Sequence, residues 1–201
     1  MRPAEAEARL ARALARAGAG GEPSSDRELH EAPTPPVGPL RPAAVLLAVD
    51  LSNGPARLLL TRRAAHLRHH PGQIALPGGR TDPGEDAVTC ALREASEEVG
   101  LPAGAAEVLG LLPAHETVTG FAVTPVLAVL RTGFVPRPQA GEVEEVFAIP
   151  LAHCADPGRY RLEGRIWQGR LRRYWVLPWG PHYVWGATAR ILRGLALGMQ
   201  P

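Results

Sequence analysis

The sequence contains no lysine, because all 22 of its basic residues are arginines. A P-loop nucleotide-binding site, a protein kinase and an enzyme that works through a Schiff base each depend on a lysine, so these classes are excluded. Cysteine is scarce as well. Cys90 and Cys154 do not have a C-x-x-C or other metal-ligand spacing. A disulfide between them is compatible with the sequence, but a domain of this size does not need one.

Long apolar runs are also missing. No run approaches the ~20 apolar residues that span a bilayer, and the N-terminus lacks the continuous apolar region of a secretory signal. We therefore expect a cytoplasmic protein with no membrane partner. The formal net charge is only +2, which argues against wholesale binding of nucleic acid.

The 201 residues suit one domain of ordinary size with an appendage. Residues 3–17 are strong helix formers, and a Pro-, Ser- and Gly-rich stretch follows them. The sequence thus predicts an N-terminal helix and linker over residues 1–34 and a compact domain over residues 35–201. The role of the N-terminal part and the oligomeric state stay open.

One short segment, residues 79–101, combines a glycine-rich turn, a predicted helix over 86–99 and a cluster of acids. Val88, Leu92, Ala95 and Val99 recur at helical spacing and predict a buried stripe. Glu94, Glu97 and Glu98 are three or four residues apart, so they share another side of the helix, where like charges repel. A solvated acidic face paired with arginines would explain any such trio, but Pro and Gly around the helix entry favour a binding site. Oxygen-only ligands indicate a hard divalent cation, Mg²⁺ or Mn²⁺.

The same segment resembles the Nudix box, G-x5-E-x7-R-E-U-x-E-E-x-G-U, where U is aliphatic. Gly79, Glu85 and the run 93–101 match it, with Ala95 as a small occupant of the first U position. The resemblance implies a hydrolase of nucleoside diphosphates linked to another group, built as an α/β/α sandwich around a mixed sheet. It also implies roles for box residues: metal ligands Glu94 and Glu98, Glu97 as a further ligand or the general base, and Arg93 and Glu85 in the catalytic constellation.

A second segment, residues 59–79, resembles the signature of the coenzyme A pyrophosphatase branch of this family, L-L-T-x-R-S-x3-R-x3-G-x3-F-P-G-G. Ala64 replaces the usual Ser and Leu76 the usual Phe. Arginine forks suit phosphate, so Arg63 and Arg68 are expected to bind substrate, although either could simply pair with a nearby acid. Gly78 and Gly79 complete the expected substrate-binding set.

The resemblance makes coenzyme A or an acyl-CoA the expected small-molecule substrate. ADP-ribose, NADH and dinucleoside polyphosphates are alternatives, because the box specifies the reaction and not the substituent. A non-catalytic nucleotide-sensing module is a different class; such modules usually lose box carboxylates, and all four are present here.

The remaining pattern predicts a mixed α/β sheet between helices. Apolar runs at 42–51 and 56–62 flank Ser52-Asn53-Gly54-Pro55, which indicates a hairpin, and residues 107–112 and 121–130 are further predicted strands. Alternation predicts a strand over 141–150 whose start carries acids. The Nudix resemblance implies an additional carboxylate, for metal or base work, from a loop preceding such a strand, which makes Glu142, Glu144 and Glu145 candidates; solvated edge charges would also explain them. Residues 159–175 predict hairpins, and 185–199 a final helix.

Overall fold

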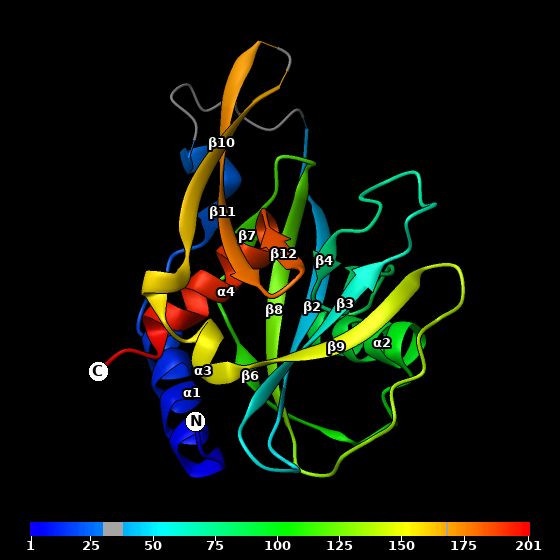
Figure 1. The fold of residues 1–201 in the computed structure, drawn as a ribbon, viewed down its shortest axis with the longest axis vertical. Coiled ribbons are helices and arrows are strands. Elements are labelled where there is room, and N and C mark those ends of the chain that lie inside the picture. The colour runs from blue at the N-terminus through cyan, green and yellow to red at the C-terminus, as the bar shows by residue number, and fades with distance from the viewer. Residues whose placement is uncertain (30–37, 168) are drawn as a thin grey trace.

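The chain folds around a mixed β-sheet in a computed structural model that describes residues 1–29, 38–167 and 169–201 (Figure 1). The central strand β2 (Arg41–Asp50) pairs in parallel with β8 (Phe121–Leu130) over its whole length and antiparallel with β3 (Arg57–Arg63). Residues of β2 are buried on both faces, as is typical of a strand covered from two sides. The other strands of this sheet are β1 (Ser24–Ser25), β4 (Ile74–Ala75), β5 (Gly78–Arg80), β6 (Ala106–Leu111), β7 (His115–Glu116) and β9 (Val143–Pro150).

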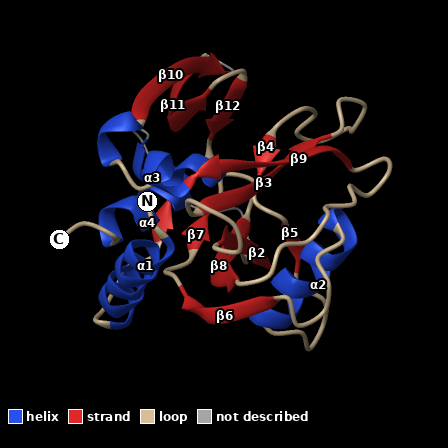
Figure 2. Cartoon of the chain, turned by 60° about the horizontal axis from the view of Figure 1, so that its bottom comes forward, coloured by secondary structure: helices blue, strands red, loops and turns tan. Residues whose placement is uncertain are grey.

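Helices cover both faces of this sheet (Figure 2). Helix α2 (Ala87–Val99) packs on one face in a hydrophobic cluster with β2 and β8. Helices α1 (Pro3–Gly18) and α4 (Ala187–Gly198) pack on the other face in a second cluster, next to the short helix α3 (Leu151–Cys154). The α/β/α sandwich around a mixed sheet is therefore confirmed.

A second, three-stranded antiparallel sheet lies beside α4. It consists of β10 (Arg161–Trp167), β11 (Arg170–Trp179) and β12 (His182–Trp185), in that order. The hairpin predicted over 159–175 is thus confirmed. Figure 1 shows its β10–β11 end projecting beyond the rest of the molecule.

The N-terminal helix belongs to the packed structure. Ala6, Leu10 and Ala13 of α1 are buried in the same cluster as α4. After α1, the chain is fastened by the fully buried His115, which is hydrogen-bonded to Ser24 at 3.0 Å and to Asp26 at 3.1 Å. The predicted boundary between residues 34 and 35 lies outside the described residues. No helix of the described part is long and apolar enough to cross a membrane.

Candidate active site

Helix α2 is fixed at both ends by caps that the sequence encodes. The Asp86 side chain accepts a 2.8 Å hydrogen bond from the Thr89 amide, and Gly100 takes the left-handed conformation (φ 69°) that ends the helix. The buried face of α2 consists of Cys90, Ala91, Ala95, Glu98 and Val99. Val88 and Leu92 are only half-buried, so the predicted stripe is rotated toward the small residues, which let α2 approach the sheet closely.

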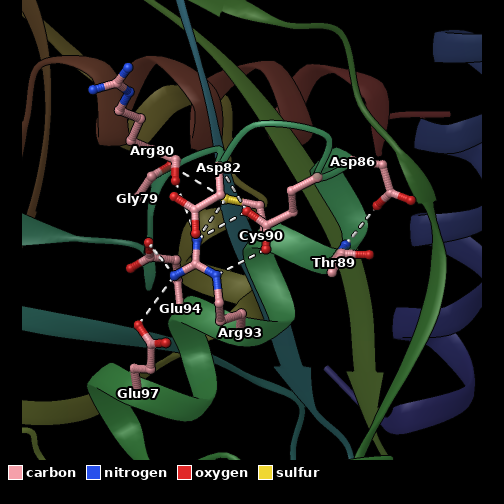
Figure 3. Close-up of polar contacts among 10 residues, drawn as sticks. Gly79, Arg80, Asp82, Asp86, Thr89, Cys90, Arg93, Glu94 and Glu97 are labelled. Carbon is pink, nitrogen blue, oxygen red and sulfur yellow. Dashed lines mark hydrogen bonds and ion pairs between the residues drawn. The ribbon is translucent and has the colours of Figure 1, made fainter.

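Arg93 forms ion pairs with three of the box carboxylates, Glu85, Glu94 and Glu97 (Figure 3). Its guanidinium donates two hydrogen bonds to Glu85, at 2.9 and 3.1 Å, and one each to Glu94 at 2.9 Å and Glu97 at 3.2 Å. These bonds lower the pKa of Glu85 to about 2 and raise the pKa of Arg93. Arg93 therefore stays charged and holds the acids in fixed positions.

Glu98 is the most deeply buried of the acids. Its side chain accepts one hydrogen bond, from the Gly78 amide at 3.1 Å, and the residue is 5% exposed. Burial raises the pKa of Glu98 to about 7, and the charge of Glu94 adds to the shift. Burial also raises the pKa of Glu94 in spite of the adjacent Arg93. Glu94 and Glu98 are thus two neighbouring carboxylates whose ionisation is unfavourable. A divalent cation bound between them would neutralise their charges and remove this cost.

Glu97 is the most exposed of the three neighbouring acids on this helix. Its side chain is 52% exposed and turns toward Arg93. The three acids still form one patch: Nη1 of Arg93 bonds both Glu94 and Glu97, and the charge of Glu97 adds to the raised pKa of Glu94. Within this patch Glu94 and Glu98 are withdrawn from solvent, whereas Glu97 lies on the outer surface. The described residues contain no complete cluster of three His, Cys, Asp or Glu side chains arranged to hold an ion.

Gly78 and Gly79 bring the backbone of β5 against the carboxylates. A Cβ at Gly79 would overlap the carboxylate of Glu94, and a Cβ at Gly78 would come within 2.6 Å of Val45 Cα. Neither position accepts a side chain without movement. The glycines thus allow the Gly78 amide to approach Glu98 and the Glu94 carboxylate to lie on Gly79.

The three acids around the start of β9, Glu142, Glu144 and Glu145, differ in their position relative to the box. Glu144 and Glu145 form ion pairs with Arg62, at 3.4 and 3.1 Å, and no contact of either with the box is seen among the described residues. By contrast, the charge of Glu142 adds to the raised pKa of both Glu94 and Glu98, so Glu142 lies within electrostatic reach of them. The Glu142 carbonyl accepts the Ala64 amide at 2.8 Å, which fixes this loop. Glu142 was already a candidate as an acid at the start of the predicted strand 141–150, and the structure places it just before β9.

The two arginines of the 59–79 segment also differ. The half-buried Arg63 lies on the box side, where its charge opposes the rise in the pKa of Glu98, and its Nε has no hydrogen-bond partner in the described part of the chain. Arg68 is exposed on the loop between β3 and β4. The structure therefore brings Arg63 to the carboxylates and leaves Arg68 at the surface.

A cavity of about 420 Å³ lies between this loop and the β11–β12 turn. Arg62, which pairs with Glu144 and Glu145, lines it. His182, stacked on Phe147 at 3.9 Å, forms part of its wall. The other lining residues are His70, Pro71, Gly72, Gln73, Ile74, Pro181, Tyr183 and Trp185.

Comparison with known proteins decides the family. A profile of the NUDIX domain matches residues 39–164. This chain belongs to the Nudix hydrolase family. It is 47% identical over 165 residues to the Nudix hydrolase NudL of Salmonella paratyphi B and equally to that of Salmonella newport, covering 80% of this chain and 85% of each relative. The Nudix hydrolase RenU of M. smegmatis has a similar structure, with a TM-score of 0.51 and 28% identity over 64% of this chain and 81% of that one.

The chain is accordingly a pyrophosphohydrolase that acts on a small substrate containing a nucleoside diphosphate. Nudix hydrolases generally use divalent metal ions. The residues present fit such an ion: Glu94 and Glu98 offer hard oxygen ligands, are partly or fully buried, and have raised pKa values that a cation would reverse.

Proposed function

We propose that this Nudix hydrolase cleaves the diphosphate of coenzyme A or of an acyl-CoA. The products would be adenosine 3′,5′-bisphosphate and 4′-phosphopantetheine or its acyl form. The proposal rests on residues 59–79, which resemble the coenzyme A pyrophosphatase signature and which touch both the box and the cavity.

The observation that carries the proposal is the course of this segment. At one end, the Gly78 amide binds Glu98 and Arg63 lies on the box side of β3. In its middle, residues 70–74 form a wall of the 420 Å³ cavity. One continuous segment is therefore available to hold the reacting diphosphate and to select the group attached to it.

The two departures from the signature are buried positions. Ala64 is 6% exposed and Leu76 is 3% exposed, and both pack in the interior. A residue that packs in the interior influences substrate binding only indirectly, so both replacements are compatible with coenzyme A as the substrate.

Within the reaction, we assign metal binding to Glu94 and Glu98 and positioning of the acids to Arg93 and Glu85. A bound Mg²⁺ or Mn²⁺ supplies charge neutralisation at the diphosphate and makes a water more acidic. Glu97 is one candidate for the base that accepts the proton of the attacking water.

Glu142 is the other leading candidate base, because its charge reaches both Glu94 and Glu98. Glu144 and Glu145 remain weaker candidates, since both are engaged by Arg62. The pair Arg62–Glu145 lies instead at the cavity side of the sheet, where it can hold the cavity wall in place.

The arginines take different parts in this proposal. Arg63, near the carboxylates, is suited to the diphosphate itself. Arg68, exposed on the loop that leads to the cavity, is suited to the ribose 3′-phosphate. Loss of Arg63 should then slow every substrate, whereas loss of Arg68 should affect only those with a 3′-phosphate.

The test is kcat/KM for coenzyme A, dephospho-coenzyme A, ADP-ribose and NADH in saturating Mg²⁺ or Mn²⁺, with the wild type, Arg63→Ala and Arg68→Ala. We expect dephospho-coenzyme A to be poorer than coenzyme A by about one to two orders of magnitude, since a charge-assisted hydrogen bond is worth roughly 1.5–3 kcal/mol. Arg68→Ala should erase that difference.

Three outcomes would count against this reading. If ADP-ribose, NADH or a dinucleoside polyphosphate is preferred by tenfold or more, the coenzyme A assignment is wrong although the reaction class stands. Equal rates for coenzyme A and dephospho-coenzyme A would remove the role of the 3′-phosphate. Loss of discrimination in Arg63→Ala rather than Arg68→Ala would exchange the two arginines.

A further inference from the structure

The outer strand of the second sheet has an open edge. Among the described residues, β10 pairs with β11 and with no other strand. Its end projects from the molecule (Figure 1), and Leu162, Gly164 and Ile166 are all exposed. An edge strand presents a row of unpaired N–H and C=O groups and can accept another strand.

One face of this hairpin is unusually apolar. Ile166 is 73% exposed, and Leu162 and Leu171 are each 45% exposed. Leu171 is directly opposite Ile166 in the ladder, so the two share a face, and its Cδ1 lies over Gly164. A β-branched residue with three-quarters of its surface in water, beside two exposed leucines, indicates a surface that another molecule covers.

The charges of the edge alternate with these apolar residues. Arg161, Glu163 and Arg165 occupy the opposite face of β10, because successive residues of a strand point to opposite sides. The Glu163 carboxylate accepts a 2.6 Å hydrogen bond from the Tyr183 hydroxyl, which orients it, and Arg165 also has an interaction within its own chain.

Geometry restricts how two such edges can pair. In an antiparallel pair, the residues that face each other are of the same kind: in one facing pair both direct their N–H and C=O groups to the partner strand, and in the next pair neither does. Two identical edges related by a two-fold axis must therefore be centred on a residue. The central choices for β10 are Glu163, Gly164 and Arg165.

Only one of these registers satisfies the side chains. Centred on Glu163, the pairing sets Glu163 against itself and Arg161 against Arg165; centred on Arg165, it sets Arg165 against itself. Centred on Gly164, it sets Glu163 against Arg165 of the second copy and Leu162 against Ile166, each twice. Opposite charges and aliphatic pairs stabilise facing positions, and like charges destabilise them.

We propose that two copies of this chain associate through an antiparallel β10–β10 edge pair centred on Gly164. The contact is isologous, as expected for a two-fold dimer, and it joins the two hairpins into one continuous sheet. The aliphatic residues of both copies then form one covered patch. The inference does not depend on the identity of the substrate.

A contact of seven residues per chain is small, so the association is weak and dependent on concentration. It also lies one hydrogen bond from the cavity, because Tyr183, which binds Glu163, lines the cavity. Because β10 contains no residue of the box, the box variants should not alter the pairing.

The experiment is sedimentation velocity of the full chain over roughly 1–300 µM, a range that brackets weak association. The wild type should pass from monomer to dimer. Glu163→Arg and Arg165→Glu should each raise the dissociation constant by about tenfold or more, because each sets like charges together twice. The double variant E163R/R165E should restore dimerisation beyond either single variant.

Matched controls separate this surface from general effects. Arg57→Glu makes the same change of charge at an exposed position of the other sheet, and it should leave the dissociation constant within about threefold of the wild type. Leu162→Ser should weaken the dimer, whereas Leu197→Ser, which changes a similarly exposed leucine on α4 (42% against 45%), should not. Circular dichroism of each variant checks the fold.

Two results would overturn the proposal. The first is a wild type that stays monomeric at 300 µM. The second is a dimer whose dissociation constant is unaffected by both single charge variants, or one that the double variant fails to restore while its fold is intact, since either would place the contact elsewhere.

Discussion

Glu98→Gln should damage catalysis and stabilise the metal-free protein at the same time. Glu98 is 5% exposed, receives one hydrogen bond, and is the deepest carboxylate of the site. Its negative charge is useful only when a cation is bound. Without the cation, that charge opposes folding, and an uncharged side chain of similar shape should relieve the cost.

The magnitude follows from the pKa. The difference between about 7 in the folded chain and the ordinary 4.5 corresponds to about 3 kcal/mol at ~1.4 kcal/mol per tenfold change in proton affinity. Because the folded-state pKa is raised, the stabilisation by the proton is complete below about pH 4.5 and is lost as the pH rises through 7. The metal-free wild type should therefore lose stability between pH 5 and pH 8.

The assay is thermal unfolding in EDTA at pH 5, 6, 7 and 8, with and without added Mg²⁺. At pH 8 we expect Glu98→Gln to unfold about 6–12 °C above the wild type, at roughly 2–4 °C per kcal/mol for a chain of this size. Added Mg²⁺ should stabilise the wild type, more at pH 8 than at pH 6, and should not stabilise the variant. Turnover of the variant should fall by about a hundredfold or more.

Glu97→Gln is the matched control, since Glu97 lies on the same helix with its side chain 52% exposed. Its metal-free stability should stay close to that of the wild type. The reasoning is refuted if Glu98→Gln is less stable than the wild type at pH 8 without metal, or if it keeps a near wild-type rate.

Further variants test the rest of the site. Arg93→Ala should lower kcat/KM by about tenfold or more and raise the Mg²⁺ concentration needed for half-maximal rate, because the acids it holds lose their common partner; Mg²⁺ titration checks this. Gly79→Ala should likewise impair Mg²⁺ binding in the same titration, since the added methyl overlaps Glu94. Glu142→Gln should reduce kcat more than Glu145→Gln. The opposite order in steady-state rates would make Glu145 the better candidate for the general base.

The local features of the site were accessible from the sequence. Helix α2 was predicted over 86–99 from the helical spacing of its apolar residues, and the structure adds that Asp86 caps it and Gly100 ends it. The hairpin of β2 and β3 followed in the same way from a turn between two apolar runs. Such signals involve neighbours in the chain, and the structure confirms them.

The features that arise from distant contacts were not accessible. Spacing alone could not tell that Glu97 turns outward to Arg93 while Glu98 is buried under Gly78. Nor could it tell that Arg62 engages Glu144 and Glu145, which depends on the pairing of β3 with β9. The cavity is lined by residues from 70–74 and from 181–185. Nothing in the sequence of either segment indicates that the two lie next to each other in the fold.

The central claim is that the Nudix box of this chain cleaves the diphosphate of coenzyme A. The most direct measurement incubates the protein and Mg²⁺ with equal amounts of coenzyme A, ADP-ribose and NADH in one tube and follows the products by mass spectrometry, with Glu98→Gln in a parallel tube. The account predicts that adenosine 3′,5′-bisphosphate and 4′-phosphopantetheine appear first and that neither forms with Glu98→Gln. Earlier formation of AMP from ADP-ribose or NADH, or undiminished cleavage by the variant, would contradict it.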